Sequence, residues 1–204
     1  MDEIVLAARS GNVEKIVFLF HGYGADKDDL LPIGERISDV LPEAEIRLPN
    51  GIEKCGEGRR QWFGLEGDDV RLWKLAFEKN CTRITSYIDS VINEKSLTNK
   101  NVIFSGFSQG AMLSLSLGLK YNAAATIAFS GLLLDPEVCA DNCDTKILLT
   151  HGEKDNVIPI TALKLTEEAL KKYGISVEIA ISPDLAHGID SYLLNQAIDF
   201  LKRL

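Results

Sequence analysis

Residues 101–112 of the chain read NVIFSGFSQGAM. The β-branched and aromatic run at residues 102–104 predicts a buried strand, and residues 111–121 have the apolar spacing of a helix. Between them, Gly-x-Ser-x-Gly predicts a tight turn centred on Ser108. A strand, a tight turn and a helix in direct succession are the context in which this pentapeptide forms a nucleophile elbow. The stretch therefore predicts an α/β fold with the Ser108 side chain aimed out of a central sheet.

The turn at Ser108 also predicts how a negative charge would be held there. The following helix would present free N–H groups and the positive end of its dipole to the serine. The backbone N–H of Gln109, directly after the nucleophile, is expected to donate to an oxyanion. Gly106 and Gly110 leave room for the strand and the helix to approach closely.

Size and charge predict a single cytoplasmic domain, residues 1–204, that would bury roughly 70% of the surface of the unfolded chain. The formal net charge of −8, with no block of Lys and Arg, argues against nucleic acid and anionic membranes as partners. The apolar runs are too short to insert stably into a bilayer. Residues 1–11 carry acidic side chains and no apolar signal core, so we do not expect export.

The four cysteines, at positions 55, 81, 139 and 143, are expected to be free thiols in a reducing compartment. They form no Cys-x-x-Cys, and neither a second pair nor a nearby histidine completes a zinc site around Cys139 and Cys143. A disulfide between Cys139 and Cys143 is the alternative. We expect neither a metal nor an organic cofactor.

Strand-like and helix-like segments alternate along the chain. Strands are predicted at residues 15–20, 45–48, 102–104, 124–130, 146–150 and 176–181. Helices are predicted at residues 28–41, 69–94 with a break near Asn80, 111–121, 161–172 and 189–204. Residues 7–12 are expected to form an edge feature or hairpin around Gly11-Asn12. The alternation predicts a mostly parallel sheet with helices on both faces, and chemistry beyond the carboxyl ends of its strands.

One long irregular segment, residues 51–67, contains five glycines and Gln61-Trp62-Phe63 at its centre. Loops of this length inside a compact domain are usually functional or disordered. The two aromatic residues favour a loop that packs back against the body of the protein.

A serine hydroxyl becomes a nucleophile when a base takes its proton and a third group orients that base. Of the three histidines, His21 follows a strand directly and suits a structural or oxyanion-loop role. His151 ends a strand and is interpreted as a hydrogen-bonded strand-end residue. His187 lies between the last strand and the last helix, where the order Ser, acid, His places the base. We therefore predict that replacing His187 abolishes activity, whereas replacing His151 leaves most of it.

Asp155 is the predicted acid, because it lies just past a strand end, on the sheet edge shared by Ser108 and the His187 loop. Asp184 is too close along the chain to His187 to orient its far ring nitrogen. The remaining candidates fall on a polar connector, on a helix surface or within a strand: Asp135, Asp141, Asp144, Glu167, Glu168 and Glu178. For the second oxyanion donor, the loop after the first central strand offers Tyr23 or Gly24.

Six blocks in order carry a family resemblance: FLFHGYGAD (18–26), LPN (48–50), QWF (61–63), GFSQGAM (106–112), HGEKDNVIP (151–159) and HG (187–188). They resemble the phospholipase/carboxylesterase family of small serine hydrolases, which includes acyl-protein thioesterases and bacterial carboxylesterases. The likeness runs from about residue 16 to residue 189. It implies an α/β-hydrolase fold without a separate lid domain, often as a monomer or homodimer.

The resemblance also implies roles for single residues. Ser108, Asp155 and His187 match the nucleophile, acid and base, and Tyr23 would pair with Gln109 in the oxyanion hole. Trp62 corresponds to an aromatic at the substrate site, with a loop anchor as the equal alternative. Gly24 is expected beside the substrate as well. The family more often has leucine where this chain has Tyr23, and a backbone donor tolerates that change.

The expected activity is that of a serine carboxylesterase acting on esters or thioesters of short to medium acyl chains. Lysophospholipase and acyl-protein thioesterase activities fall within this class. The alternatives are a peptidase or amidase on the same scaffold, and a non-catalytic acyl- or lipid-binding protein. A pure binder needs none of Ser108, Asp155 and His187, and peptidases of this fold usually carry a substrate-restricting domain that 204 residues do not accommodate. The sequence does not set acyl-chain length, ester against thioester, or oligomeric state.

Overall fold

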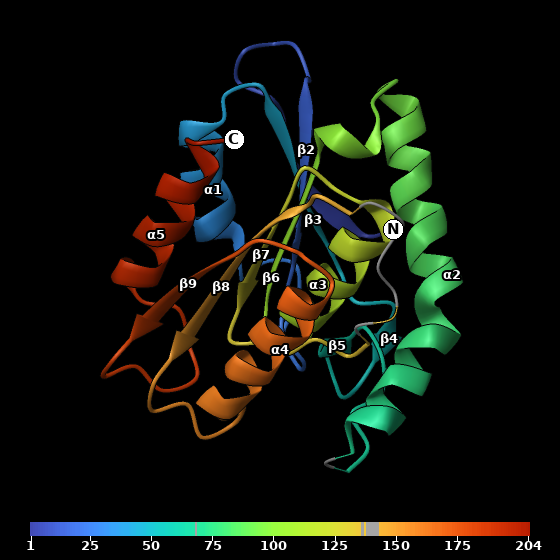
Figure 1. Cartoon of the computed structure of the whole chain (residues 1–204). Helices are drawn as coiled ribbons and strands as arrows, with labels where there is room; N and C mark the ends of the chain where they lie inside the picture. The colour runs from blue at the N-terminus through green and yellow to red at the C-terminus, as the bar shows by residue number, and fades with distance from the viewer. Residues whose placement is uncertain (68, 136, 138–142) are drawn as a thin grey trace.

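A seven-stranded sheet forms the centre of the protein (Figure 1). The computed structural model describes residues 1–67, 69–135, 137 and 143–204. The strands of the sheet are β1 (Glu3–Leu6), β2 (Lys15–Phe20), β3 (Ala44–Pro49), β6 (Val102–Phe107), β7 (Ala125–Phe129), β8 (Lys146–Gly152) and β9 (Val177–Ser182). A separate two-stranded antiparallel sheet contains β4 (Glu53–Lys54) and β5 (Arg60–Gln61).

The order of strands across the large sheet is β1-β3-β2-β6-β7-β8-β9. Every neighbouring pair runs parallel except β1, which lies antiparallel to β3 at one edge. The prediction of a mostly parallel sheet is therefore confirmed. Because parallel strands end at the same edge, the loops after β2, β6, β7, β8 and β9 gather there.

Helices cover both faces of the sheet, as expected for a parallel sheet whose strands are apolar on both sides (Figure 1). The helices are α1 (Leu31–Val40), α2 (Val70–Glu94), α3 (Gln109–Tyr121), α4 (Ile160–Lys172), α5 (Ser191–Leu201) and the short 3₁₀ helix η1 (Asn99–Asn101). Helices α1 and α5 lie on one face, and α2, α3 and α4 lie on the other.

Alternate residues of β2 point into the two cores that this arrangement creates. Val17 and Leu19 pack with residues of α1 and α5, whereas Ile16, Phe18 and Phe20 pack with residues of α2 and α3. All five side chains are buried. The continuous apolar run of this strand follows directly from burial on both faces.

The edge of the sheet differs from the prediction. The edge strand is Glu3–Leu6, which pairs with β3 so that Ile4 lies opposite Leu48, whereas residues 7–12 form turns. A four-residue strand is too short to show a period, so its pairing with β3 decides its conformation. The long segment at residues 51–67 likewise contains the unpredicted β4–β5 pair.

Helix α2 runs for 25 residues without the break expected near Asn80. The Asn80 side chain donates through Nδ2 to Glu53 Oε1 at 2.7 Å and to the Trp62 carbonyl at 3.0 Å. Its amide therefore finds acceptors on the neighbouring loop and does not compete with the helix backbone.

Cys55, Cys81 and Cys143 are free thiols, whereas Cys139 lies outside the described residues, and with it the alternative of a disulfide to Cys143. None of the described helices has the length and apolarity needed to cross a membrane.

The two elbow glycines lie where the backbones of β2, β6 and α3 meet. A Cβ added at Gly110 would lie 2.0 Å from the Phe20 carbonyl oxygen, and one added at Gly106 would lie 2.5 Å from the Gly110 carbonyl. Backbone atoms cannot move away without breaking strand or helix bonds, so only glycine fits at either position.

Replacing Gly110 with alanine is expected to lower the free energy of unfolding by about 3 kcal/mol, the upper range for an overpacked core. Gly64→Ala is the matched control, because no atom lies within 4 Å of the Cβ position there. Urea unfolding of the two variants measures the difference. Equal stability of Gly110→Ala and the unsubstituted protein would show that the backbones of β2 and α3 are not in close contact at Gly110.

Candidate active site

Ser108 is the single residue that connects the end of β6 to the start of α3. Its backbone has φ 53° and ψ −114°, a conformation that costs a non-glycine residue on the order of 1–3 kcal/mol. The Ser108 N–H donates to the carbonyl of Phe129 at the end of β7, over 2.8 Å. The strained turn gives Ser108 the geometry of a nucleophile elbow and brings its hydroxyl to the loop that carries His187.

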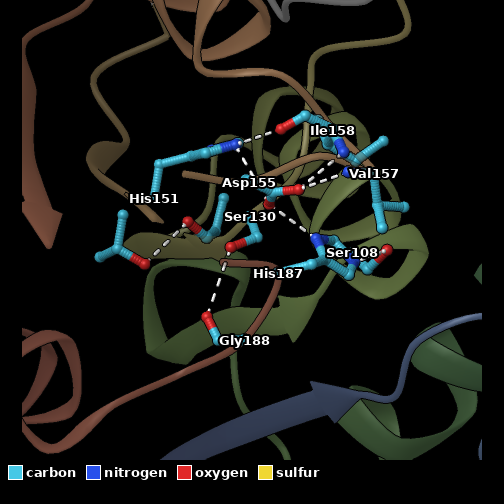
Figure 2. A network of polar contacts seen from close by, with 10 residues as sticks. Ser108, Ser130, His151, Asp155, Val157, Ile158, His187 and Gly188 are labelled. Carbon is cyan, nitrogen blue, oxygen red and sulfur yellow. Dashed lines mark hydrogen bonds and ion pairs between the residues drawn. The ribbon is translucent and has the colours of Figure 1, made fainter. Parts of the chain in front are cut away.

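Three side chains from separate loops form one hydrogen-bonded chain at this edge of the sheet (Figure 2). His187, between β9 and α5, has its Nε2 3.0 Å from Ser108 Oγ. Its Nδ1 lies 2.7 Å from Oδ2 of Asp155, which follows β8. The structure thus brings together the predicted nucleophile, base and acid.

The chemistry of these groups fixes the direction of the hydrogen bonds. An ionised carboxylate only accepts, so His187 donates through Nδ1–H to Asp155, and its Nε2 accepts from the Ser108 hydroxyl. The Asp155 side chain is 0% exposed, and its Oδ1 accepts from the N–H groups of Val157 and Ile158, each at 2.9 Å. A buried, fixed carboxylate in this position orients the imidazole and stabilises its protonated form.

The two expected oxyanion donors lie on the loop after β2 and at the start of α3. Within the described part of the chain, neither the Tyr23 N–H nor the Gln109 N–H has a hydrogen-bond partner. Gly24, the alternative second donor, has its N–H bonded to the Arg60 carbonyl at 2.9 Å, which leaves Tyr23 as the candidate. The Tyr23 side chain is half exposed, and Gly24 lines an adjoining surface cavity of about 500 Å³.

His21 fixes the loop that carries Tyr23. Its Nδ1–H donates to the Gly22 carbonyl at 2.7 Å, and its Nε2 accepts from the Gly51 N–H at 2.9 Å. Burial lowers the pKa of His21, which keeps the ring neutral and leaves Nε2 able to accept. His21 therefore has a structural role in the oxyanion loop.

Of the two roles considered for Trp62, substrate contact and loop anchor, the contacts of the side chain favour the loop anchor. Its side chain is 0% exposed, its Nε1–H donates to the His21 carbonyl at 3.0 Å, and its ring lies edge-on to Phe20 with centroids 5.0 Å apart. A fully buried indole has no surface to offer a substrate. The structure therefore corrects the expectation of a substrate-site aromatic: Trp62 anchors the loop at residues 51–67.

The side chain of Gln109 has a role that sequence reasoning missed. Its Oε1 accepts from the Trp62 N–H at 2.9 Å and its Nε2 donates to the Phe63 carbonyl at 2.7 Å. One buried amide thus ties the long loop to the elbow. The available signal was a polar residue at the first position of a helix whose next four residues are glycine or apolar.

Close backbone contacts hold the loop of His187 against β8. A Cβ added at Gly152 would lie 2.2 Å from the Ala186 carbonyl oxygen, and the Lys154 N–H donates to the Leu185 carbonyl at 3.0 Å. On the other side, the Ser130 hydroxyl lies 3.4 Å from the Gly188 carbonyl (Figure 2). Like Ser108, Ser130 has a positive φ, of 51°.

His151 lies next to Asp155. It is fully buried at the end of β8, and its Nε2 is 2.7 Å from the Ile158 carbonyl and 3.4 Å from Asp155 Oδ2 (Figure 2). The expected hydrogen bond of a strand-end histidine is present. Its proximity to Asp155 was not expected.

The carboxylates set aside by the sequence lie away from His187 where they are described. Asp184 is 91% exposed and pairs with Lys154 at 2.5 Å, and Asp135 pairs with Lys74 at 2.7 Å. Asp141 lies outside the described residues. Among the described His, Cys, Asp and Glu side chains, no group of three or more is arranged to hold a metal ion.

Comparison with known sequences identifies the family of this chain. The sequence model of the Phospholipase/Carboxylesterase family matches residues 1–204. The chain belongs to this family. Among the relatives in the phospholipase/carboxylesterase family is Esterase YpfH of Escherichia coli, 27% identical over 212 residues, covering 98% of this chain and 88% of that protein. Another is Acyl-protein thioesterase 1 homolog 2 of Dictyostelium discoideum, 29% identical, covering 98% and 96%.

Solved structures have the same fold as this chain. The crystal structure of esterase PE8 superposes with a TM-score of 0.90 at 31% identity, covering 98% of this chain and 97% of that one. Arabidopsis thaliana SOBER1 superposes with a TM-score of 0.81 at 23% identity, covering 93% and 98%, which shows a shared fold. The α/β-hydrolase fold class and the family resemblance predicted from the sequence are confirmed.

Proposed function

We propose that this member of the phospholipase/carboxylesterase family is a serine esterase that cleaves carboxylic esters or thioesters of short to medium acyl chains. The observation that carries the proposal is the unbroken chain from Ser108 Oγ through His187 to Asp155, at 3.0 Å and 2.7 Å. A nucleophile, a base and an orienting acid in contact are what acyl transfer to serine requires.

Acylation begins when Ser108 Oγ attacks the substrate carbonyl carbon while His187 Nε2 takes the hydroxyl proton. The carbonyl oxygen becomes an oxyanion and accepts hydrogen bonds from the N–H groups of Tyr23 and Gln109. As the tetrahedral intermediate collapses, the bond to the leaving oxygen or sulfur breaks, and His187 gives its proton to that atom. The acyl group remains as an ester of Ser108.

Deacylation repeats the same steps with water. His187 removes a proton from water as its oxygen attacks the acyl carbonyl, and the oxyanion again rests on the two backbone donors. The proton then returns to Ser108 Oγ, and the carboxylic acid leaves. Asp155 stays ionised throughout and stabilises the imidazolium in both halves of the reaction.

An apolar groove near Ser108 supports the acyl-chain assignment. It is lined by residues of α2, α4 and the segment after β7, among them Val70, Leu133, Ala162 and Leu165. Leu132, which also lines it, follows Gly131 directly after the strand end that holds Ser108. Its volume of about 240 Å³ is below the ~300–1,000 Å³ of pockets for drug-sized ligands, which favours a short to medium chain.

A second cavity lies directly against His187. It has a volume of about 280 Å³ and is lined by His187, Phe107, Leu30, Ile33 and Asp29, among others. Since His187 protonates the leaving group, the leaving alcohol or thiol is expected on this side.

Fluorophosphonate labelling combined with an acyl series tests the proposed function. We expect one covalent adduct, on Ser108, and hydrolysis of p-nitrophenyl esters and matched thioesters from acetyl to octanoyl. A native protein without an adduct and without turnover would contradict the esterase proposal and favour the acyl-binding alternative. Cleavage of peptide or anilide substrates faster than esters would favour the peptidase or amidase.

Narrowing the groove should change selectivity for chain length. Ala162→Phe is expected to raise KM for the octanoyl ester by about tenfold, the effect of about one or two methylenes in an apolar pocket. Turnover of the acetyl ester serves as the internal reference, and Ala7→Phe, exposed on the segment after β1, is the control variant. Unchanged octanoyl kinetics in Ala162→Phe would place the acyl chain elsewhere.

We also infer a cytoplasmic protein that acts as a monomer or homodimer. The free thiols of Cys55, Cys81 and Cys143 are consistent with a reducing compartment. Cell fractionation and light scattering test location and assembly separately.

A further inference from the structure

A second imidazole lies beside Asp155, close to the same carboxylate oxygen that accepts from His187. His151 is 0% exposed and lies four residues before the acid, at the end of β8. Its Nε2 is 2.7 Å from the Ile158 carbonyl oxygen and 3.4 Å from Asp155 Oδ2. Figure 2 shows Asp155 between the two histidine rings. The reaction steps above make no use of this group.

The contacts of the ring determine which nitrogen carries the proton. A carbonyl oxygen only accepts, so Nε2 of His151 must be the donor to Ile158. Its Nδ1 is buried and has no hydrogen-bond partner among the described residues. The tautomer with its proton on Nε2 and a bare Nδ1 matches these contacts.

The residue that binds His151 also binds the acid. Ile158 donates its N–H to Asp155 Oδ1 at 2.9 Å and accepts from His151 through its carbonyl. His151 thus braces the short loop whose N–H groups hold one carboxylate oxygen. The same Nε2 lies 3.4 Å from the other carboxylate oxygen, the one that accepts from His187.

We propose that His151 is a positioning residue of the hydrolase, which fixes Asp155 in the orientation that His187 requires. The inference rests on the proposed function. Its physical advantage is neutrality: a lysine or arginine here would pair with the carboxylate and weaken its effect on the imidazolium of His187. An uncharged ring that binds the Ile158 carbonyl fixes the loop that holds the acid and leaves the negative charge of Asp155 for catalysis.

Three substitutions of His151 distinguish a role in positioning Asp155 from a role in packing alone. His151→Phe keeps a buried ring and removes the donor. His151→Gln places an amide nitrogen near the position of Nε2, and His151→Asn places one near Nδ1. Thr150→Val is the matched control, because the neighbouring Thr150 is equally buried and donates from Oγ1 to the Ala128 carbonyl at 3.4 Å.

The measurement is kcat and KM for p-nitrophenyl butyrate, with the concentration of active sites determined by fluorophosphonate titration. The proximity of His151 to Asp155 replaces the expectation from the sequence that a His151 variant keeps most of the activity. His151→Phe is expected to lose about 10- to 100-fold in kcat per active site, the range for a catalytic group displaced by up to ~1 Å. KM should stay within about twofold, and His151→Gln should recover most of kcat. Thr150→Val should keep the kcat of the unsubstituted protein.

A kcat per active site that is unchanged in His151→Phe would overturn the proposal, since a merely structural residue lowers only the number of folded sites. If His151→Phe does not fold, the amide pair decides: Gln must exceed Asn in kcat, and equal values would overturn the role of Nε2. An unsubstituted protein that neither labels nor hydrolyses the ester would instead refute the proposed function itself.

Discussion

Replacing Ser108 with alanine is expected to reduce kcat/KM for ester hydrolysis by about 10⁴- to 10⁶-fold, as loss of a serine nucleophile does elsewhere. The hydroxyl 3.0 Å from His187 Nε2 is the group that forms the covalent bond to the acyl carbon. Without it, His187 has only water to activate, and the oxyanion donors supply the residual rate. Fluorophosphonate labelling should be lost in the same variant.

The Ser108 variant has a matched control on the same helix. Ser116 is buried in α3, and its hydroxyl donates to the Met112 carbonyl at 3.0 Å, so Ser116→Ala removes a comparable buried hydroxyl away from the site. It should hydrolyse the ester at the unsubstituted rate. A Ser108→Ala protein that keeps more than about one per cent of the activity would exclude Ser108 as the nucleophile, given the losses expected for one.

Replacing Asp155 with asparagine is expected to reduce kcat by about 10⁴-fold, even though the side chain keeps its shape. Oδ1 of Asp155 accepts two backbone N–H groups, from Val157 and Ile158. Those donors hold the amide oxygen of the asparagine, so its NH₂ group must take the place of Oδ2 and face His187 Nδ1 at the 2.7 Å contact.

The consequence of Asp155→Asn is a change of tautomer. A donor opposite Nδ1 stabilises the imidazole with its proton on Nε2, and that nitrogen can no longer accept the proton of Ser108. Asp184→Asn is the control, because Asp184 is three residues from His187 in the chain yet its side chain is 91% exposed. If the Asp184 variant lost activity and the Asp155 variant kept it, the acid would be misassigned.

Local sequence patterns predicted most of the central sheet. The apolar runs of β2, β6, β7 and β8 are long enough to identify as buried strands, and Gly106 and Gly110 have side-chain positions occupied by backbone. The strand β1 was missed, because only its pairing with β3 stabilises four residues as a strand. The break expected in α2 was wrong because Asn80 found its partners on another loop.

The three central site residues were predictable because the chain order of this fold places them at strand ends on one edge. Ser108 follows β6, Asp155 follows β8 and His187 follows β9. Parallel strands bring such ends together whatever the loops between them contain. The burial of Trp62 could not be predicted in this way, because a long loop has no periodic pattern from which burial can be inferred.

The sequence by itself determined the elbow, the parallel sheet and the edge at which the reactive groups meet, because strand runs, helix spacing and glycine turns are set by near neighbours. Only the tertiary structure decided which polar groups hold the site in place. The Gln109 amide reaches Trp62 across 47 positions, and the Asn80 amide reaches the Trp62 carbonyl across 18. Contacts of this kind depend on how loops pack in three dimensions, and no local pattern in the chain records them.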